Sequence, residues 1–248
     1  MYSGDAVSKG LRKRASQARQ EVRSRKRWIL AALVLLGAVC AGTAPSLAQP
    51  GRPARLVVLG DSLSAGYLLP QAEAFPAVLE QALLQRGYSV SVANAAVSGD
   101  TTSGGLARLD RDVPDGTDGV ILQLGANDRL RRVDPEVTRG ALEQIVTRLG
   151  SRGIAVLLAG VRFSDEGEGD VARFNGVFPA VARRYRLPYY PDFYRGISTN
   201  PRFTIFDGVH PSSEGVRWIL GGILPSVERF VRTLPARAGA RPRQPGSS

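Results

Sequence analysis

The sequence predicts an α/β fold, a three-layer α/β/α sandwich built on a mostly parallel sheet of about five strands. Two observations support this prediction. Short apolar runs of strand length alternate along the chain with longer segments whose apolar residues recur at helical spacing. Two of the predicted strands are apolar throughout, which suits strands covered by helices on both faces. Repeated β and α segments of this kind build a parallel sheet between two helical layers.

Five segments are predicted to be strands. Ser89–Ala93 alternates polar and apolar residues, so this strand is expected to be partly exposed or to lie at an edge. Gly119–Leu124 and Ile154–Ala159 are the two apolar strands. The full set is Arg55–Leu59, Ser89–Ala93, Gly119–Leu124, Ile154–Ala159 and a short Tyr189–Pro191.

Helical patterns fill the intervals, at about 73–86, 103–112, 135–149, 171–186 and 212–232. The third has the clearest limits, with Asp134 as N-cap, Pro135 in the first turn and Gly150 at its end. Phe174 and Phe178 lie four residues apart in the fourth helix and are expected to face the core.

Residues 1–48 are predicted to be an export signal. Residues 1–27 carry nine Lys/Arg and two acids, and the apolar segment Trp28–Val39 follows. Ser46-Leu47-Ala48 offers small residues to a signal peptidase, so cleavage is expected before Gln49. An uncleaved membrane anchor is the alternative, because residues 28–44 reach the lower limit of a membrane span. In both cases residues 49–248 are expected outside the cytoplasm, periplasmic or secreted.

The remainder divides into a linker at 49–54, one folded domain at 55–234 and a flexible tail at 235–248 rich in Arg, Pro and Gly. The whole chain has a formal net charge of +11. Nine of its 33 Lys/Arg and two of its 22 acids lie in the leader, which leaves residues 49–248 at +4. The high charge therefore belongs to the export signal, and a nucleic-acid partner is not indicated.

The composition excludes several kinds of chemistry. All three lysines precede residue 28, the only cysteine is Cys40 and the only histidine is His210. A cysteine nucleophile, a lysine Schiff base and a phosphate-binding-loop lysine are thus excluded from the folded domain. His/Cys zinc sites need three or four such ligands, so no metal and no cofactor are expected. Serine chemistry, carboxylate chemistry and simple binding remain.

Polar residues follow three of the predicted strands at the edge where reactive groups gather in parallel sheets. Ser62 follows the first strand, and a serine nucleophile requires a nearby base, for which His210 is the only imidazole. The loops after the second and third strands offer a glycine N–H and an asparagine amide, which are donors that an oxyanion hole needs. Taken singly, the loops at Ser62 and at Asn127-Asp128 are equally consistent with ordinary turns, and Gly99–Gly105 could instead be a phosphate-cradling loop, against which the lack of a following lysine argues.

Four blocks in this order resemble the signature blocks of the SGNH hydrolases, the GDSL esterase/lipase superfamily. They are Gly60-Asp61-Ser62-Leu63-Ser64-Ala65-Gly66-Tyr67, Ser98-Gly99-Asp100-Thr101, Gly125-Ala126-Asn127-Asp128 and Asp207-Gly208-Val209-His210-Pro211. The resemblance covers residues 55–234 and is strongest to bacterial exported arylesterases, acyl-thioesterases and lysophospholipases. It implies the flavodoxin-like fold of these enzymes and hydrolysis of carboxylic esters or thioesters through an acyl-enzyme. It also implies a nucleophile at Ser62, oxyanion donors at Gly99 and Asn127, and Asp207 and His210 as the rest of the triad.

The sequence departs from that family at three places. Ala126 and Arg129 stand where glycine is common, and residues 161–170 replace a Pro-Pro-Asn type loop. The expected substrate is a small-molecule or lipid ester, and membrane contact is expected only through an uncleaved leader. Two alternatives remain open: a carbohydrate or cell-envelope O-acetylesterase, and a non-catalytic envelope-binding domain. The sequence does not indicate an oligomeric state.

Overall fold

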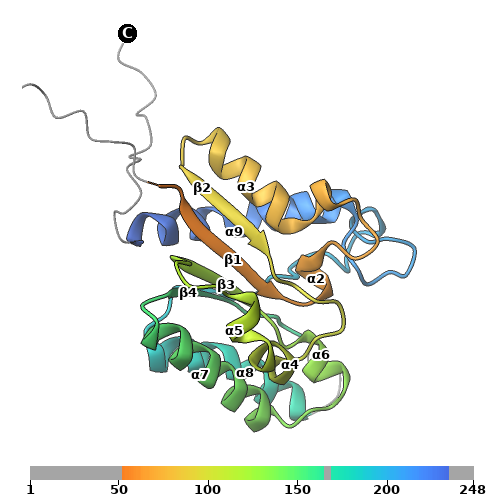
Figure 1. Ribbon diagram of the computed structural model, residues 1–248. Helices are drawn as coiled ribbons and strands as arrows, with labels where there is room; N and C mark the ends of the chain where they lie inside the picture. Colours follow the sequence, from red (N-terminus) through yellow and green to blue (C-terminus); the bar gives the residue numbers. More distant parts are fainter. Residues whose placement is uncertain (1–51, 165–168, 235–248) are drawn as a thin grey trace, which may run out of the picture. The chain divides into compact units, whose positions relative to one another are not determined.

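The computed structural model describes residues 52–164 and 169–234, and these form three layers (Figure 1). The central layer is a five-stranded sheet in the order β2-β1-β3-β4-β5, with every neighbouring pair parallel. The predicted α/β/α sandwich is therefore confirmed. Its strands are β1 (Ala54–Gly60), β2 (Val90–Asn94), β3 (Gly119–Gln123), β4 (Ala155–Ala159) and β5 (Tyr189–Tyr190). The predicted leader at 1–48 and tail at 235–248 lie outside the described residues.

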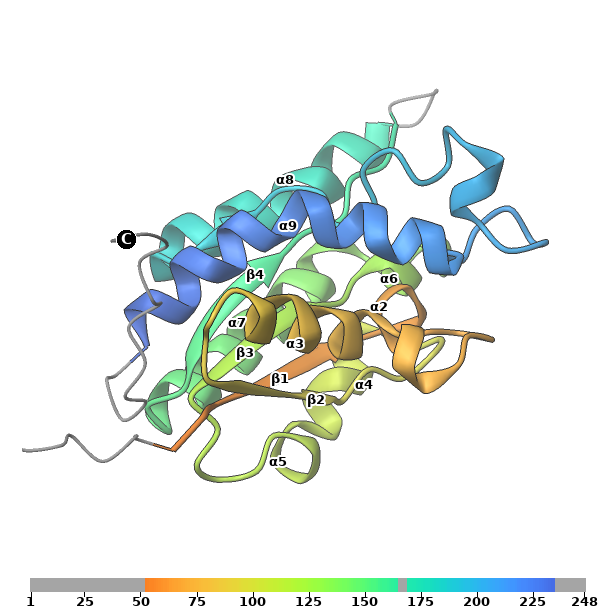
Figure 2. The same cartoon turned by 90° about the horizontal axis from the view of Figure 1, so that it is seen from above.

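Helices cover both faces of the sheet (Figures 1 and 2). On one face lie α3 (Phe75–Gln85) and α9 (Ser213–Thr233), which pack against each other. On the other face lie α4 (Thr102–Ala107), α5 (Leu109–Asp112), α7 (Pro135–Ser151) and α8 (Gly169–Tyr185). Two short helices, α2 (Ser62–Ala65) and α6 (Ala126–Leu130), and two 3₁₀ turns, η1 (Gln71–Glu73) and η2 (Pro201–Phe203), complete the set. None of the described helices is long and apolar enough to cross a membrane.

The burial of the strands agrees with their sequence patterns. All five residues of β3 are buried, and so are four of the five in β4. In β2 only the first residue is fully buried, and the strand lies at an edge of the sheet as its alternation predicts. A strand between two neighbours and under helices on both faces has no solvent side, so it favours apolar residues throughout.

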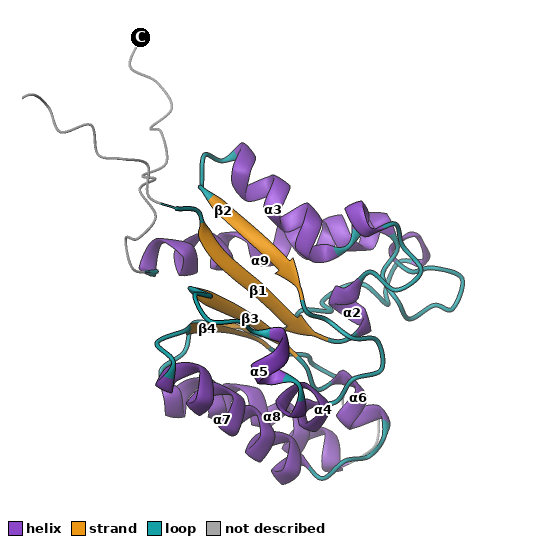
Figure 3. Ribbon diagram, in the orientation of Figure 1, coloured by secondary structure: helices purple, strands orange, loops and turns teal. Residues whose placement is uncertain are grey.

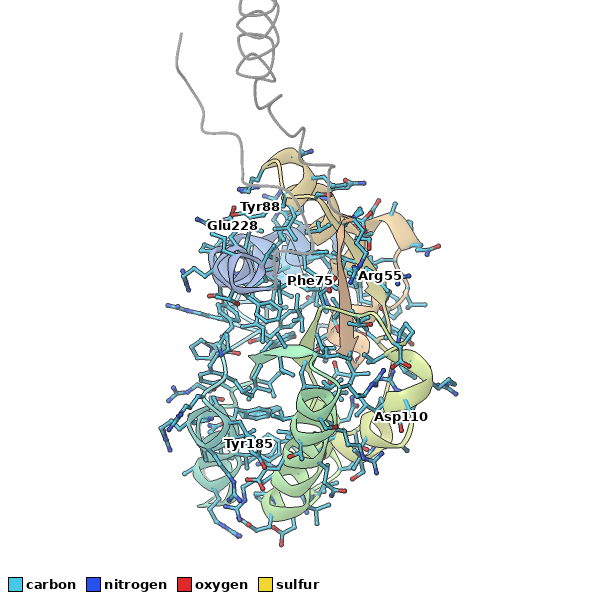
Figure 4. All side chains as sticks on the ribbon, turned by 60° about the vertical axis from the view of Figure 1, so that its left-hand side comes forward. Arg55, Phe75, Tyr88, Asp110, Tyr185 and Glu228 are labelled. Carbon is cyan, nitrogen blue, oxygen red and sulfur yellow. The ribbon has the colours of Figure 1, made fainter. Side chains whose placement is uncertain are left out.

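The core lies between the sheet and each helical layer. Phe75 of α3 is completely buried in the interior of the molecule (Figure 4), and its ring meets that of Phe193 edge-on with 4.9 Å between the centroids. Phe174 and Phe178 of α8 are 1% and 0% exposed, which confirms their predicted place in the core. Burial of a phenylalanine side chain contributes about 1.5–3 kcal/mol each to folding. These aromatic residues thus hold both helical layers on the sheet.

The predicted helix at 103–112 is wrong in one respect, because the structure breaks it at Arg108 into α4 and α5. The buried side chain of Arg108 is directed to backbone carbonyls outside the helix, so its tertiary contacts override the helical pattern. Asp134 caps α7 as predicted, by accepting from the N–H of Glu136 at 2.9 Å. The predicted stop at Gly150 is wrong: the helix continues to Ser151, and Gly153 takes the left-handed conformation, with φ 70°.

Three short segments gather at the carboxyl ends of the strands (Figure 3). The helix α2 follows β1, α4 follows the loop after β2, and α6 follows β3. The chain order reverses between β1 and β3, because β2 lies on the outer side of β1. In open parallel sheets such a reversal opens a crevice in which ligands bind. The fold therefore places the loops after β1 and β3 at the entrance of a natural binding site.

Candidate active site

The first predicted site residue, Ser62, opens α2 directly after β1 and is 8% exposed. Asp61 caps this short helix by accepting from the N–H of Leu63 at 3.0 Å, and its carboxylate also accepts from Gln123 Nε2 at 3.1 Å. Gln123 lies at the end of β3 and also accepts from Ser64 Oγ at 2.8 Å. The loop that carries Ser62 is thus bonded to the next strand of the sheet, which limits the positions open to Ser62.

Asp61 is a buried carboxyl group that forms no ion pair within the part of the chain that the structure describes. Its pKa is raised to about 6, chiefly by burial and in smaller part by the negative charges of Asp128 and Asp100, which together outweigh the lowering effect of the hydrogen bonds from Leu63 and Gln123. Its second oxygen, Oδ2, has no hydrogen-bond partner among the described residues. Buried polar atoms are usually paired, so this oxygen is an unsatisfied acceptor directly behind Ser62.

Ser62, His210 and Asp207 form a chain of hydrogen-bond contacts. The Nε2 atom of His210 lies 3.0 Å from Ser62 Oγ, and its Nδ1 atom lies 2.6 Å from Asp207 Oδ2. The ring of Tyr67 packs on His210 with 4.4 Å between the ring centroids. The structure thus brings together three of the five predicted site residues, from segments that lie 148 positions apart in the chain.

The turn that carries Asp207 and His210 fixes the carboxylate by its own backbone. Asp207 Oδ1 accepts from the N–H groups of Val209 and His210, each at 2.9 Å. Burial raises the pKa of Asp207, but the hydrogen bonds from the His210 ring and from these two N–H groups outweigh it and lower the pKa to about 2. Asp207 is therefore ionised at any pH near neutrality, and an ionised carboxylate holds the imidazole N–H in place.

The other two predicted site residues, Gly99 and Asn127, lie on loops that bond to each other. Asn127 Nδ2 donates to the carbonyl of Asp100 at 2.9 Å, and Arg131 Nη2 donates to the carbonyl of Gly99 at 2.7 Å. Gly99 has a φ of +80°, a backbone conformation that residues other than glycine rarely adopt. One of the two N–H groups of Asn127 is used in this contact, which leaves the other for a ligand.

Asp128 anchors the same two loops from beneath. It is completely buried and accepts from the N–H of Thr102 at 2.9 Å, from the Thr102 hydroxyl and from the Thr138 hydroxyl at 3.2 Å. The two residues of the Asn-Asp pair in the third block therefore have different roles: Asn127 lines the pocket, and Asp128 is buried in the core. The alternative interpretation of this pair as an isolated turn does not account for these long-range contacts.

A pocket of about 290 Å³ opens over Ser62 and His210. Asn127 lies on its wall, and so do the ring of Phe163, from the divergent segment 161–170, and the ring of Tyr194, which the sequence did not single out. The remaining wall is formed by the residues Leu63, Ala126, Leu130, Val161, Arg162, Ser164, Ser198 and Val209. The cation on the wall is Arg162, whereas Arg129, which stands where the family often has glycine, is not among the lining residues.

Tyr194 connects the pocket wall to the catalytic turn. Its hydroxyl donates to the carbonyl of Val209, and burial together with the negative charge of Asp207 raises its pKa. Tyr194 lies after β5 in a segment with no motif, so no sequence signal could have found it. Tyr67, in contrast, is the last residue of the first signature block, so the sequence did point to it.

Metal ligands do not gather in this region. Within residues 52–164 and 169–234, no three His, Cys, Asp or Glu side chains come together as a metal site requires. The polar groups at the pocket are instead a serine hydroxyl, an imidazole bonded to a carboxylate, and an asparagine amide. This combination fits nucleophilic attack on a carbonyl carbon.

Comparison with known proteins agrees with this chemistry. Residues 58–218 match the model of the GDSL-like lipase/acylhydrolase family. An arylesterase of Vibrio mimicus is 37% identical over 167 residues, which cover 66% of this chain and 84% of the relative. Thioesterase 1/protease 1/lysophospholipase L1 of Escherichia coli (strain K12) is 33% identical over 178 residues, covering 71% and 84%. The crystal structure of AlinE4, a SGNH-hydrolase family esterase, is 35% identical with a TM-score of 0.60, covering 73% and 97%.

The fold and the site together define a serine esterase, an enzyme that hydrolyses carboxylic esters. The chain belongs to the GDSL-like lipase/acylhydrolase family. Its substrates are small-molecule esters.

Proposed function

We propose that the enzyme hydrolyses aryl esters, thioesters and lysophospholipid-type esters of short to medium acyl length through an acyl-enzyme on Ser62. The observation that carries this proposal is the contact chain Ser62–His210–Asp207, with distances of 3.0 and 2.6 Å, beside a pocket of about 290 Å³. A serine hydroxyl is a weak nucleophile, so a base at this distance is what gives it reactivity.

The reaction begins when His210 Nε2 accepts the proton of Ser62 Oγ, which attacks the carbonyl carbon of the ester. The tetrahedral oxyanion accepts hydrogen bonds from the N–H of Ser62, the N–H of Gly99 and the amide of Asn127. When the intermediate collapses, the protonated His210 gives its proton to the departing alcohol or thiol. Water then attacks the acyl group with His210 again as base, and the acid is released with Ser62 restored.

Asp207 orients the base in both half-reactions. Its ionised carboxylate accepts from the Nδ1–H of His210, which leaves Nε2 free to receive the proton of Ser62. The same carboxylate stabilises the imidazolium that forms. The pKa of Asp207, about 2, keeps this group charged throughout the pH range in which such enzymes work.

The wall of the pocket supports an acyl substituent. Beyond the reacting groups, six wall residues are apolar and they include Leu63, Leu130 and Val209. The relatives named as arylesterase and as thioesterase 1/protease 1/lysophospholipase L1 support the same range of substrates. The relatives do not favour the alternative of a sugar O-acetylesterase. A spread of polar and aromatic residues would suit a sugar, and the wall does carry Arg162, Ser164 and Ser198, so acetylated sugars belong in the substrate test.

We also propose that residues 1–48 direct export, with cleavage before Gln49 and a membrane anchor as the alternative. The basic segment 1–27 and the apolar segment that follows it support this proposal. The functional domain at 55–234, with a linker before it and a tail after it, remains part of the same proposal.

A chain-length series of p-nitrophenyl esters and acyl-CoA thioesters tests the function. We expect kcat/KM to increase from acetyl to medium acyl chains, because each methylene buried in the pocket contributes about 0.8 kcal/mol. Ser62→Ala should lower turnover by roughly 10⁴ or more. The matched control is Ser151→Ala at the far end of α7, where the hydroxyl only donates to the carbonyl of Arg148. Activity confined to acetylated sugars would contradict the proposed substrate class.

A further inference from the structure

Arg108 is a buried arginine that lies between the loops of the proposed nucleophile and the proposed oxyanion donors. Its side chain is 8% exposed, and it occupies the junction where α4 ends and α5 begins. The guanidinium makes four hydrogen bonds, two to backbone carbonyls and two to carboxylates. A guanidinium has five N–H donors, so nearly all of its capacity is used inside the protein.

The first pair of bonds reaches the ends of two strands. Arg108 Nη2 donates to the carbonyl of Gly60 at 3.0 Å, and Gly60 is the last residue of β1, two positions before Ser62. The N–H of Val97 donates to the same carbonyl at 3.0 Å. Arg108 Nη1 donates to the carbonyl of Ala95, just beyond β2, at 2.5 Å. The arginine thus holds the strand end from which the nucleophile loop departs.

A third bond reaches the oxyanion loop. Arg108 Nε donates to Asp100 Oδ2 at 2.6 Å, and Asp100 follows Gly99 directly. The carbonyl of the same Asp100 accepts from Asn127 Nδ2 at 2.9 Å. Asp100 therefore contacts Asn127 with its backbone and Arg108 with its side chain. A continuous series of bonds runs from the strand end before Ser62, through Arg108 and Asp100, to both side-chain and backbone donors of the oxyanion hole.

The geometry requires an arginine. Its planar fork directs N–H groups at several acceptors at fixed angles, whereas a lysine ammonium on a flexible stem is a single point of charge. Stability alone is a weak reason to bury such a group, because the desolvation penalty of a buried ion pair often exceeds its Coulombic gain. The guanidinium of Arg108 instead holds the nucleophile loop and the oxyanion loop at a fixed distance from each other.

We propose that Arg108 is a positioning residue that sets the nucleophile loop and the oxyanion hole at their working distance through Asp100. This inference rests on the proposed roles of Ser62, Gly99 and Asn127. An oxyanion donor acts only when it lies about 2.7–3.1 Å from the developing charge. A displacement of about 1 Å by a residue outside the reacting groups can lower a rate about 10²-fold.

Two carboxylates on Arg108 provide a matched comparison. Asp100 and Asp112 each accept from its guanidinium, at 2.6 and 2.9 Å, and their side chains are 14% and 18% exposed. Asp112 lies in α5 and otherwise accepts from the exposed Arg111, so it leads to neither loop. Asp100→Asn and Asp112→Asn remove the same charge from the same arginine. The two variants differ in whether the lost partner belongs to the oxyanion loop, and Asp112→Asn also weakens the exposed pair with Arg111.

Three measurements on the full-length enzyme distinguish positioning from simple stability: kcat and KM for p-nitrophenyl butyrate, Ki for an aliphatic trifluoromethyl ketone, and the melting temperature. The ketone adds to the serine and forms a tetrahedral oxyanion, so its Ki reports the oxyanion hole. Asp100→Asn should lower kcat about 10–100-fold and raise Ki by a similar factor, with KM nearly unchanged, because the loss is confined to the transition state. Asp112→Asn should lower the melting temperature and leave kcat and Ki within about threefold of wild type. Arg108→Lys should follow Asp100→Asn in kcat and Ki.

Equal changes in kcat and Ki for the two aspartate variants, or a kcat loss in Asp100→Asn without a rise in Ki, would overturn the proposal. The aspartate pair decides the question even when Arg108→Lys fails to fold, because both variants retain the guanidinium and its carbonyl contacts. A failure of the proposed function has a different signature. In that case the ketone would not inhibit the wild-type enzyme, or Ser62→Ala would retain its turnover.

Discussion

Two aspartates beside the site have opposite electrostatic environments. Asp207 accepts three hydrogen bonds from N–H groups, and these lower its pKa to about 2 in spite of burial. Asp61 is buried and has no ion-pair partner among residues 52–164 and 169–234, and its pKa is raised to about 6, chiefly by burial. The first carboxylate is therefore charged at all working pH values, whereas the second changes its charge in the mildly acidic range. Desolvation and hydrogen bonding thus separate two groups of the same chemical type.

Asp61 should make folding stability depend on pH. Its pKa is higher in the folded protein than the ordinary value of 3.8, so the folded state binds the proton more tightly, and stability falls as pH rises from about 4 to 6. A rise to about 6 corresponds to a loss of about 3 kcal/mol across this window. Urea unfolding of wild type and Asp61→Asn at pH 4 to 7 measures it. We expect the difference between the two to change in favour of the variant as pH rises; a constant difference would contradict the raised pKa.

The same carboxyl group complicates the pH profile of activity. An acid limb in kcat/KM is expected because a general base must be unprotonated to act, and Asp61 also changes its charge in the mildly acidic range. Asp207 is charged well below this range and does not contribute. The profile of Asp61→Asn separates the two groups. The limb should persist in this variant if His210 is the base, and its disappearance would assign it to Asp61.

Asn127 should act on the transition state. Its amide lies on the pocket wall, so Asn127→Ala should lower kcat by about 10²–10³, or roughly 3–4 kcal/mol, with little change in KM. Asn94→Ala is the control, because Asn94 is not among the residues that line the pocket and its Nδ2 donates to the carbonyl of Ala65 at 3.2 Å. Steady-state kinetics of both variants with a p-nitrophenyl ester give the comparison. A rise in KM alone for Asn127→Ala would make it a ground-state binding residue.

At the scale of elements, α6 depends on a conformation that only glycine accepts easily. Gly125 precedes α6 with φ +122°, and a Cβ atom there would lie 2.7 Å from Phe178 Cζ in α8. The helix α6 carries both Asn127 and Asp128, so its entry angle sets the direction of the pocket amide. A side chain at Gly125 would combine backbone strain with overpacking of the core.

Glycine substitutions at two positions should have opposite effects on stability. Gly125→Ala should lower the free energy of unfolding by about 2–4 kcal/mol through strain and overpacking. Gly140→Ala in the middle of α7 should raise it by about 0.5–1 kcal/mol, because alanine is the better helix former and no atom outside its own helix lies within 4 Å of a Cβ there. Chemical denaturation measures both. The same sign for the two variants would contradict the packing described for α6 and α8.

Sequence reasoning found the long elements and missed the short ones, for a physical reason. Strands such as β3 and helices such as α7 show their burial as an apolar pattern over many residues. The helix α2 has four residues and α6 has five, which is too few for a period to show. The break at Arg108 was also invisible, because it depends on carbonyls that β1 and the loop after β2 supply from far along the chain.

At the scale of the whole molecule, the sheet order explains why four separated blocks meet. The segments after β1 and β3 are neighbours because these strands pair, and α9 follows the turn that brings His210 back over Ser62. The four blocks could be found in the sequence because each has a characteristic residue pattern. Pocket residues such as Tyr194 and Ser198 could not, since their place depends only on how the later loops fold over the sheet. Away from the site, Glu228 of α9, labelled in Figure 4, pairs with Arg86 at the end of α3 at 3.4 Å.

The proposed export signal determines where the whole chain is delivered, and N-terminal sequencing of the expressed protein tests it. We expect mature protein that begins near Gln49, because the apolar segment and Ser46-Leu47-Ala48 meet the requirements of a signal peptidase. A reporter fused after residue 248 should be extracytoplasmic. Full-length protein in the membrane fraction would favour the anchor, and a cytoplasmic pool of full-length protein would contradict both forms of the proposal.

The central claim is that Ser62 is a nucleophile activated by His210, and covalent labelling tests it most directly. The wild-type enzyme and His210→Ala are treated with an alkyl fluorophosphonate at neutral pH, and the adduct is located by peptide mass mapping. We predict one adduct, on Ser62, that forms about 10²–10⁴-fold more slowly without the imidazole. An adduct on Ser64 or Ser98, or equal labelling rates in the two proteins, would contradict the account.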